Sequence, residues 1–244
     1  MIDPQQLNFL DYGLIALVAL GLPVLSLWDH KRFERKLETG RDDALRSMYL
    51  SGMGMLWLPT MLIIGHWLYA GRNLADMGLS IAPTIAGGIG LAVALLATAQ
   101  LTAQVFQVRR SADAAEHVLK ELRRTPALEK ILPKTPADYA LFKGLSVTAG
   151  ITEEIMFRGY LIWGFSFWME SWLAALLALA AFVLAHLYQD SKEALLKVAL
   201  TGGALTLLYM LSGSLIPAII LHAVIDLTSG AACWHARQKK PETA

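Results

Sequence analysis

Long apolar runs, separated by shorter polar connections, make up most of the chain. A helix needs about 20 apolar residues to cross the hydrocarbon core of a bilayer, and several runs reach that length. The pattern predicts an all-α polytopic membrane protein of about seven transmembrane helices, at residues 9–28, 47–70, 81–107, 138–163, 171–189, 192–211 and 215–235.

The connections between these runs alternate between rich and poor in Lys and Arg. The connection "DHKRFERKLETGRDDALR" is rich and "GRNLADMGLS" is poor, and the alternation continues to the basic tail "HARQKKPETA". Because connections rich in Lys and Arg stay on the cytoplasmic side of a membrane, the alternation supports seven spans. It also predicts that the N-terminus lies outside and the C-terminus in the cytoplasm.

Two helix starts can be located from capping residues. Thr135, Pro136 and Asp138 fit the N-cap, first and third positions of the fourth span. Asp190 and Glu193 predict the start of the sixth span in the same way.

The segment between the third and fourth spans is predicted to be an amphipathic helix. Ala115, Val118, Leu119 and Leu122 fall on one face of it, which is typical of a helix that lies on the anionic cytoplasmic leaflet. A solvated connector is the alternative. The single integral membrane domain, 1–244, then divides into 1–107 with three spans, the cytoplasmic interfacial segment 108–135, and 136–235 with four spans.

Composition agrees with a membrane location. Of the 244 residues, 55% are hydrophobic and 17% are charged, and the mean hydropathy is +0.47, whereas soluble domains are less apolar and more charged. The formal net charge of +1 gives no reason to expect a nucleic-acid partner. The single cysteine, Cys233, excludes an internal disulfide framework and a cysteine-rich metal site.

Ionisable residues interrupt the predicted spans in several places. Each costs at least ~2.5–3.5 kcal/mol at the centre of a bilayer on insertion scales, so each is a candidate functional residue. These residues are Glu153, Glu154, Arg158, His186, His222 and Asp226.

Spacing separates the roles of the first three. Glu154 and Arg158 are four positions apart with the acid first, which favours an ion pair on one helix face. A purely structural pair is the alternative. Glu153 points about 100° away from Glu154, and Phe157 rather than a basic residue lies four positions after it. Glu153 is therefore the carboxylate best suited to act as a general base.

The other three residues supply two imidazoles and a further carboxylate. His222 and Asp226 are four positions apart in the last span, where the carboxylate can orient the imidazole. His186 stands alone in the fifth span. Together the three clusters provide groups that can activate water and stabilise a carbonyl oxyanion. The sequence has no G-x-S-x-G or H-E-x-x-H motif for serine or zinc protease chemistry.

Three short motifs resemble those of a known family. "EEIMFRG", "FVLAH" and "HAVID" follow, in order, the E-E-x-x-x-R, F-x-x-x-H and H-x-x-x-N patterns of the CPBP family, which comprises CAAX proteases and bacteriocin-processing enzymes and is also called Abi. The likeness covers about residues 136–235 and implies a four-helix catalytic core. It implies an intramembrane endopeptidase that hydrolyses peptide bonds with glutamate-activated water, without a covalent intermediate and without a cofactor.

The resemblance also implies roles for the motif residues. Glu153 would be the general base, and His186 would help to hold the water. His222 would line the oxyanion site, while Glu154 and Arg158 would support the constellation. Peptides or membrane proteins in the lipid bilayer would be the substrates, and a bacterial plasma membrane would be the location.

The last motif departs from the family pattern at Asp226, where prenyl-protein endoproteases carry Asn. An ionised carboxylate would repel an oxyanion, so Asp226 is expected to be protonated or to orient His222. Zinc binding by Glu153, His186, His222 and Asp226 is a further alternative. The departure also leaves open whether the substrate is prenylated.

Two other classes of function are alternatives to a protease. The chain could be a non-catalytic membrane partner, for example an immunity or scaffold protein that keeps the motifs for structural reasons. It could also be a proton-coupled transporter, because chains of Glu and His relay protons. The two halves show no matching pair of broken helices, which argues against a transporter.

The catalytic interpretation makes a geometric prediction. The polar atoms of Glu153, His186 and His222 should lie within about 8 Å of one another around one polar cavity, close enough for a bridging water. Asp226 should lie one turn beyond His222, and the cavity should open towards the cytoplasmic half. Straight upright helices would leave the imidazoles about 10 Å apart in depth, so the helices must deviate from that arrangement.

Overall fold

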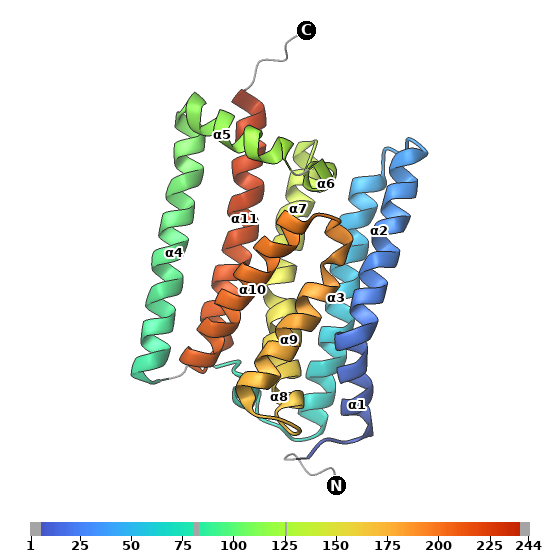
Figure 1. Cartoon of the computed structure of the whole chain (residues 1–244), viewed down its shortest axis with the longest axis vertical. Helices are drawn as coiled ribbons and strands as arrows, with labels where there is room; N and C mark the ends of the chain where they lie inside the picture. Colours follow the sequence, from blue (N-terminus) through green and yellow to red (C-terminus); the bar gives the residue numbers. More distant parts are fainter. Residues whose placement is uncertain (1–5, 81–82, 125, 240–244) are drawn as a thin grey trace.

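The computed structural model describes residues 6–80, 83–124 and 126–239, which are almost entirely helical (Figure 1). Long helices lie side by side in one bundle, and short ones connect them. The long helices are Phe9–Ala16 (α1), continued by Leu22–Glu38 (α2), Ala44–Tyr69 (α3), Ile85–Arg110 (α4), Pro136–Glu153 (α7), Ser171–Ala185 (α9), Lys192–Ser212 (α10) and Leu215–Lys239 (α11). The short ones are Leu17–Gly21 (η1), Leu74–Met77 (η2), Ala112–Arg123 (α5), Pro126–Ile131 (α6), Glu154–Leu161 (η3), Ile162–Phe165 (α8) and Leu187–Gln189 (η4).

Every predicted span coincides with a helix. Six of the described helices are long and apolar enough to cross a membrane: Phe9–Glu38, Ala44–Tyr69, Ile85–Arg110, Ser171–Gln189, Lys192–Ser212 and Leu215–Lys239. The remaining predicted span continues from α7 through η3 and α8, but Asp138 and Lys143 add to the charges of its motif residues, so it is less apolar. The all-α polytopic membrane fold is confirmed. The number of spans and their orientation stay predictions.

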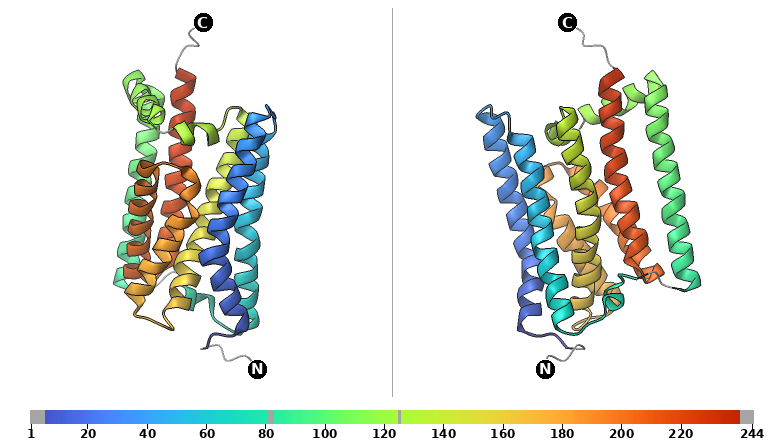
Figure 2. Two further views of the ribbon diagram at one scale, coloured as in Figure 1. Left: turned by 45° about the vertical axis from the view of Figure 1, so that its right-hand side comes forward. Right: turned by 180° about the vertical axis from the view of Figure 1, so that it is seen from behind.

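Most of the connections predicted to be cytoplasmic gather at one end of the bundle, whereas the turn between α9 and α10 lies deeper in it. The turn between α2 and α3, helices α5 and α6, and the C-terminal end of α11 lie at the upper end in Figure 1, whereas α1 begins at the opposite end. Figure 2 shows the same separation from two further sides. This arrangement agrees with the alternation along the chain between connections rich in Lys and Arg and connections poor in them.

Capping residues set the starts of α7 and α10. Thr135 accepts a hydrogen bond from the Asp138 amide, and Asp138 accepts one from the Thr135 amide, so the predicted capping box is confirmed. The cap predicted at Asp190 is wrong. Asp190 takes a left-handed conformation with φ of 44° that ends η4, and Ser191 then caps α10 by accepting from the Ala194 amide.

Helix α5 packs its apolar face on the bundle. Ala115 and Leu122 are buried, and Ala115 joins Val108 of α4 and Ala236 of α11 in an apolar cluster. Figure 1 shows α5 crossing the ends of α4 and α11. The amphipathic pattern therefore serves contacts within the protein, and contact with the lipid leaflet stays a prediction.

A buried ion pair joins the first helix to the centre of the bundle. Arg72 donates hydrogen bonds to both carboxylate oxygens of Asp11, at 2.8 and 2.6 Å, and Asp11 is fully buried. The hydroxyl of Tyr160 in η3 donates to Asp11 Oδ1 at 3.0 Å. The Arg72 guanidinium also lies over the ring of Trp163, 4.4 Å from its centroid. These contacts fix η3 against α1 and the end of α3.

Replacing Asp11 by Asn should destabilise the fold strongly. The change removes the carboxylate that neutralises the buried charge of Arg72, and breaking a buried pair typically costs about 3–5 kcal/mol. The midpoint of thermal unfolding in detergent should fall accordingly. Asp43→Asn is the matched control, because Asp43 pairs with Arg41 at the surface, where their side chains are 49% and 57% exposed, and it should leave the midpoint nearly unchanged. Equal midpoints for the two variants would contradict this account.

Candidate active site

The predicted site residues come from three parts of the bundle. Glu153 ends α7, and Glu154 and Arg158 lie in the π-helix η3 that continues it. His186 follows the last residue of α9, and His222 lies in α11. A π-helical stretch inside an α-helix is uncommon and is found most often at functional sites.

Glu154 makes the central contact of the site. Its Oε1 atom accepts hydrogen bonds from Arg158 Nη1 at 3.0 Å and from His222 Nδ1 at 2.7 Å. Glu154 is fully buried and Arg158 is only 1% exposed, so each charge depends on the other for compensation. The ion pair predicted from the four-residue spacing is confirmed. The hydrogen bond between Glu154 and His222, which are 68 positions apart, was not predicted from the sequence.

Glu153 lies between the two imidazoles. Its Oε2 atom is 3.9 Å from His186 Nε2 and 4.0 Å from His222 Nε2, so the predicted convergence of these residues is confirmed. That oxygen is buried and receives no hydrogen bond from the described part of the protein. Polar atoms about 4 Å apart can share one bridging water. Glu153 Oε2 is therefore placed to hold a water together with either imidazole.

The backbone of α9 orients His186. Its Nδ1 atom lies 2.8 Å from the carbonyl oxygen of Phe182, and a carbonyl only accepts, so Nδ1 carries the proton and donates. In the neutral ring, Nε2 then keeps its lone pair and faces Glu153. The ring packs between Phe182 and Tyr188, with centroids 4.5 and 5.9 Å away. Tyr188 was not expected at the site, and only its position two residues after His186 hints at it.

Three features bring the imidazoles to one depth. Helix α9 has only 15 residues and stops short of the upper end of the bundle in Figure 1. The start of α11 is anchored by a hydrogen bond from the Leu215 amide to the Gly78 carbonyl. Gly150 lets α7 and α11 approach closely, because a Cβ there would lie 2.6 Å from the amide nitrogen of Ala223. His222 is the residue before Ala223, so this contact sets its distance from Glu153.

Asp226 contributes differently from the expectation. Its Oδ2 atom lies 3.9 Å from His222 Nε2, which is longer than a hydrogen bond. The hydrogen bond that fixes the orientation of His222 comes from Glu154 on the other side of the ring. Asp226 is also the most exposed of these groups, with 38% of its side chain accessible. Asp226 therefore makes no direct hydrogen bond to His222, and its protonation state stays a prediction.

A cavity of about 430 Å³ adjoins these groups. Glu153, His186, His222 and Asp226 lie in its wall, and most of the remaining lining is apolar and comes from α2, α3, α7 and α10. Leu128 of α6 also lines it, so the cavity extends towards the end of the bundle that carries the basic connections. This direction agrees with the predicted opening towards the cytoplasmic half.

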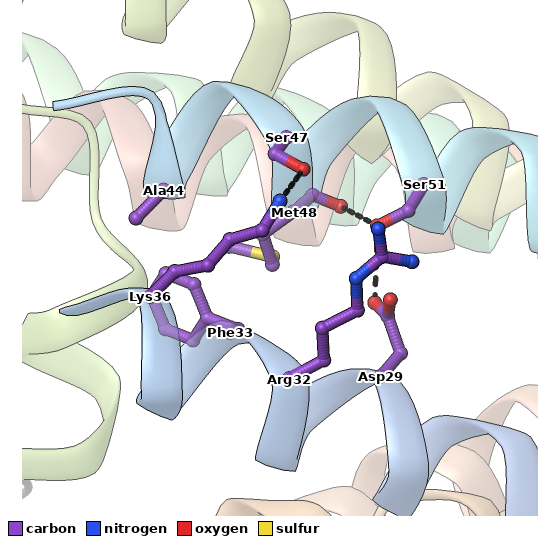
Figure 3. Close-up of a pocket in the computed structure, with 8 residues that line it drawn as sticks. All are labelled: Asp29, Arg32, Phe33, Lys36, Ala44, Ser47, Met48 and Ser51. Carbon is purple, nitrogen blue, oxygen red and sulfur yellow. Dashed lines mark hydrogen bonds between the residues drawn. The ribbon is translucent and has the colours of Figure 1, made fainter. Parts of the chain in front are cut away.

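A much smaller pocket lies beside the cavity, between α2 and α3 (Figure 3). Asp29 and Met48 line both spaces. Inside the small pocket, Ser51 donates a hydrogen bond to Asp29, and Lys36 donates one to Ser47. A volume of about 10 Å³ gives room for a single water, so this pocket is not a second substrate site.

The described residues include no group of three or more His, Cys, Asp or Glu side chains arranged to hold a metal ion. The distances of 3.9 and 4.0 Å from Glu153 Oε2 to the imidazole nitrogens suit a shared water. That the site works without a cofactor stays a prediction, and a chelation experiment below tests it.

The two adjacent glutamates should differ in their importance for stability. Glu154→Gln removes the charge that compensates Arg158 in a fully buried position, and such a loss typically costs about 3–5 kcal/mol. Glu153→Gln keeps the shape of a side chain whose buried Oε2 accepts no hydrogen bond from the described residues, so it should leave the unfolding midpoint close to that of the wild type. Thermal unfolding of the two purified variants measures the difference. A larger loss for Glu153→Gln would show that the roles are reversed.

One comparison with known proteins gives a match. Residues 136–228 match the family model described as Type II CAAX prenyl endopeptidase Rce1-like. No curated protein and no solved structure matches the chain. The matched segment contains all six of the polar residues predicted from the motifs. The match therefore confirms, for this segment, the resemblance to the CPBP family.

Proposed function

We propose that this integral membrane protein is an intramembrane endopeptidase in which Glu153 activates a water for peptide hydrolysis. The family match supports a CAAX-type protease in general. The observation that supports the specific mechanism is the position of Glu153 Oε2. This atom is buried, receives no hydrogen bond from the described residues, and is about equally far from two imidazole Nε2 atoms. This combination suits a general base.

In the proposed reaction, a water binds between Glu153 Oε2 and His186 Nε2. His186 accepts a hydrogen bond from the water because its Nδ1 proton is engaged by the Phe182 carbonyl. Glu153 takes a proton from the water as the oxygen attacks the peptide carbonyl carbon. Glu153 then returns the proton to the leaving nitrogen as the C–N bond breaks. The carboxylate is regenerated, and no covalent intermediate forms.

His222 is the proposed stabiliser of the oxyanion. Its Nδ1 proton is donated to Glu154, so Nε2 can donate to an oxyanion only if the ring carries both protons. The carboxylates of Glu153, Glu154 and Asp226 lie around this ring and favour its charged form. Prenyl-protein endoproteases carry Asn at the position of Asp226. In the proposed mechanism, the carboxylate at this position helps to keep His222 charged.

The proposed substrate is an extended segment of a peptide or membrane protein. The cavity beside the site is large enough for several side chains and mostly apolar, and it extends towards the predicted cytoplasmic side. A bacterial plasma membrane is the proposed location. The proposal does not require the substrate to be prenylated.

Glu153→Gln should abolish proteolysis while the protein still folds. Loss of a general base typically lowers the rate about 10²–10⁴-fold, and the amide keeps the shape of the side chain. The measurement compares membrane proteomes of cells that express the wild type or the variant and searches for protein N-termini that appear only with the wild type. Glu116→Gln, at an exposed position of α5, is the control for expression and should keep all of these termini. Wild-type cleavage by Glu153→Gln would exclude the mechanism, and no new termini in any strain would favour a non-catalytic partner.

Cleavage should also survive chelation. If Glu153 and His186 activate water without a metal, prolonged EDTA treatment should leave the rate unchanged, and mass spectrometry should find no stoichiometric zinc in the purified protein. Loss of activity in EDTA that is restored by Zn²⁺ would instead identify the same residues as zinc ligands.

A further inference from the structure

Helix α10 carries none of the motif residues, yet it binds one of them directly. Arg158 donates a hydrogen bond from Nη2 to the carbonyl oxygen of Gly202 at 3.0 Å and one from Nε to Thr206 Oγ1 at 3.3 Å. Thr206 is 7% exposed and Arg158 is 1% exposed, so water does not compete for these bonds. The guanidinium is thus fixed by α10 on one side and by Glu154 on the other.

The hydroxyl of Thr206 is suited to this contact by its own hydrogen bond. It donates to the Gly202 carbonyl at 2.8 Å, which uses its single proton and turns the oxygen lone pairs towards Arg158. An arginine only donates, so it needs an acceptor at this position. Valine has the same shape as threonine but offers no acceptor.

A glycine at position 202 lets the Phe182 ring pack closely against α10 beside Arg158. A Cβ at this position would lie 2.9 Å from the ring of Phe182, closer than Cβ atoms come to other atoms, and a tight 3.0 Å from the end of the Leu179 side chain. The Phe182 ring in turn lies 4.2 Å from the Arg158 guanidinium and 4.5 Å from the His186 ring. A side chain at Gly202 would therefore displace the ring that packs against both groups. At Gly203 a Cβ would meet only Leu179, at an ordinary 3.8 Å.

A continuous series of hydrogen bonds leads from α10 to the imidazole at the site. Thr206 and Gly202 hold Arg158, Arg158 donates to Glu154 Oε1, and the same oxygen accepts from His222 Nδ1. We propose that Thr206 and Gly202 are positioning residues for the hydrolysis proposed above, which act through Arg158 and Glu154 to fix the His222 ring. The assignment rests on that proposed function, but the state of His222 can be measured independently of cleavage.

The first test replaces the Thr206 hydroxyl. Thr206→Val should lower kcat for a peptide that spans the identified cleavage site about tenfold while changing KM little, because Arg158 loses an acceptor that aligns the groups. Thr206→Ser keeps the acceptor and should restore most of the rate. Thr102→Val is the matched control, because Thr102 also donates to the carbonyl four residues before it, at 2.8 Å, but lies exposed on α4.

The second test compares neighbouring glycines on one helix. Gly202→Ala should lower kcat about 10²-fold. The added methyl group displaces the Phe182 ring and with it the imidazoles that it contacts, and a misplacement of catalytic groups by about 1 Å lowers a rate by this factor. Gly203→Ala is the same substitution one residue later and should keep the wild-type rate. If Gly202→Ala does not fold, the Thr206 variants alone decide the proposal.

The spectroscopic readout separates this proposal from the proposed function. With ¹⁵N-labelled histidine, the His222 signal is identified as the one missing from His222→Asn, and in the wild type its Nδ1 should be protonated and hydrogen-bonded. Thr206→Val should shift this signal, while Thr206→Ser and Thr102→Val should leave it in place. An unchanged His222 signal with full kcat in Thr206→Val would overturn the positioning role, even if the unfolding midpoint falls. If the wild type cleaves nothing but the shift occurs, the proposed function fails and the link between α10 and His222 stands.

Discussion

One carboxylate oxygen, Oε1 of Glu154, accepts hydrogen bonds from a guanidinium and an imidazole in a place that solvent does not reach. A buried charge is tolerated only when nearby charges and donors compensate it, so Glu154, Arg158 and His222 have to be placed together. Because these residues belong to η3 and α11, and Arg158 is also held by α10, the requirement fixes three helices relative to one another. The depth of the site follows from that packing.

The neighbouring carboxylate, Glu153, has different contacts from Glu154. The charge of Glu154 is neutralised by Arg158, so its second oxygen, although also without a donor, belongs to a compensated group. Among the described residues, Glu153 has two imidazoles about 4 Å away and no ion pair with an arginine. The change from α7 to the π-helix η3 falls between these two residues. Glu154 thus joins helices of the bundle through its ion pair and hydrogen bond, whereas Glu153 is the glutamate that the proposed function uses as the base.

Contacts within one helix could be predicted from the sequence, and contacts between helices could not. The Glu154–Arg158 pair follows from a four-residue spacing, and the Thr135 cap follows from its local sequence. The convergence of Glu153 with two imidazoles could be predicted only by assuming that these residues take part in one reaction. Arg158 and Thr206 are 48 positions apart, and no local pattern predicts that they meet. The Asp190 cap failed because a left-handed residue moved the helix start by one position, which is a backbone property that composition does not reveal.

In the proposed function, the groups for the chemistry and the wall that contacts the substrate come from different parts of the chain. The matched segment, 136–228, supplies the two imidazoles and the carboxylates of Glu154 and Asp226 that lie around Glu153. Much of the opposite wall lies outside that segment and comes from α2 and α3, including Leu22, Met55 and Leu56. Apolar walls discriminate by shape, and a change of one methylene there alters binding by only about 1–3 kcal/mol. Substitutions in α2 or α3 can therefore change which segment fits without disturbing the polar groups, so proteins with the same three motifs can differ in substrate.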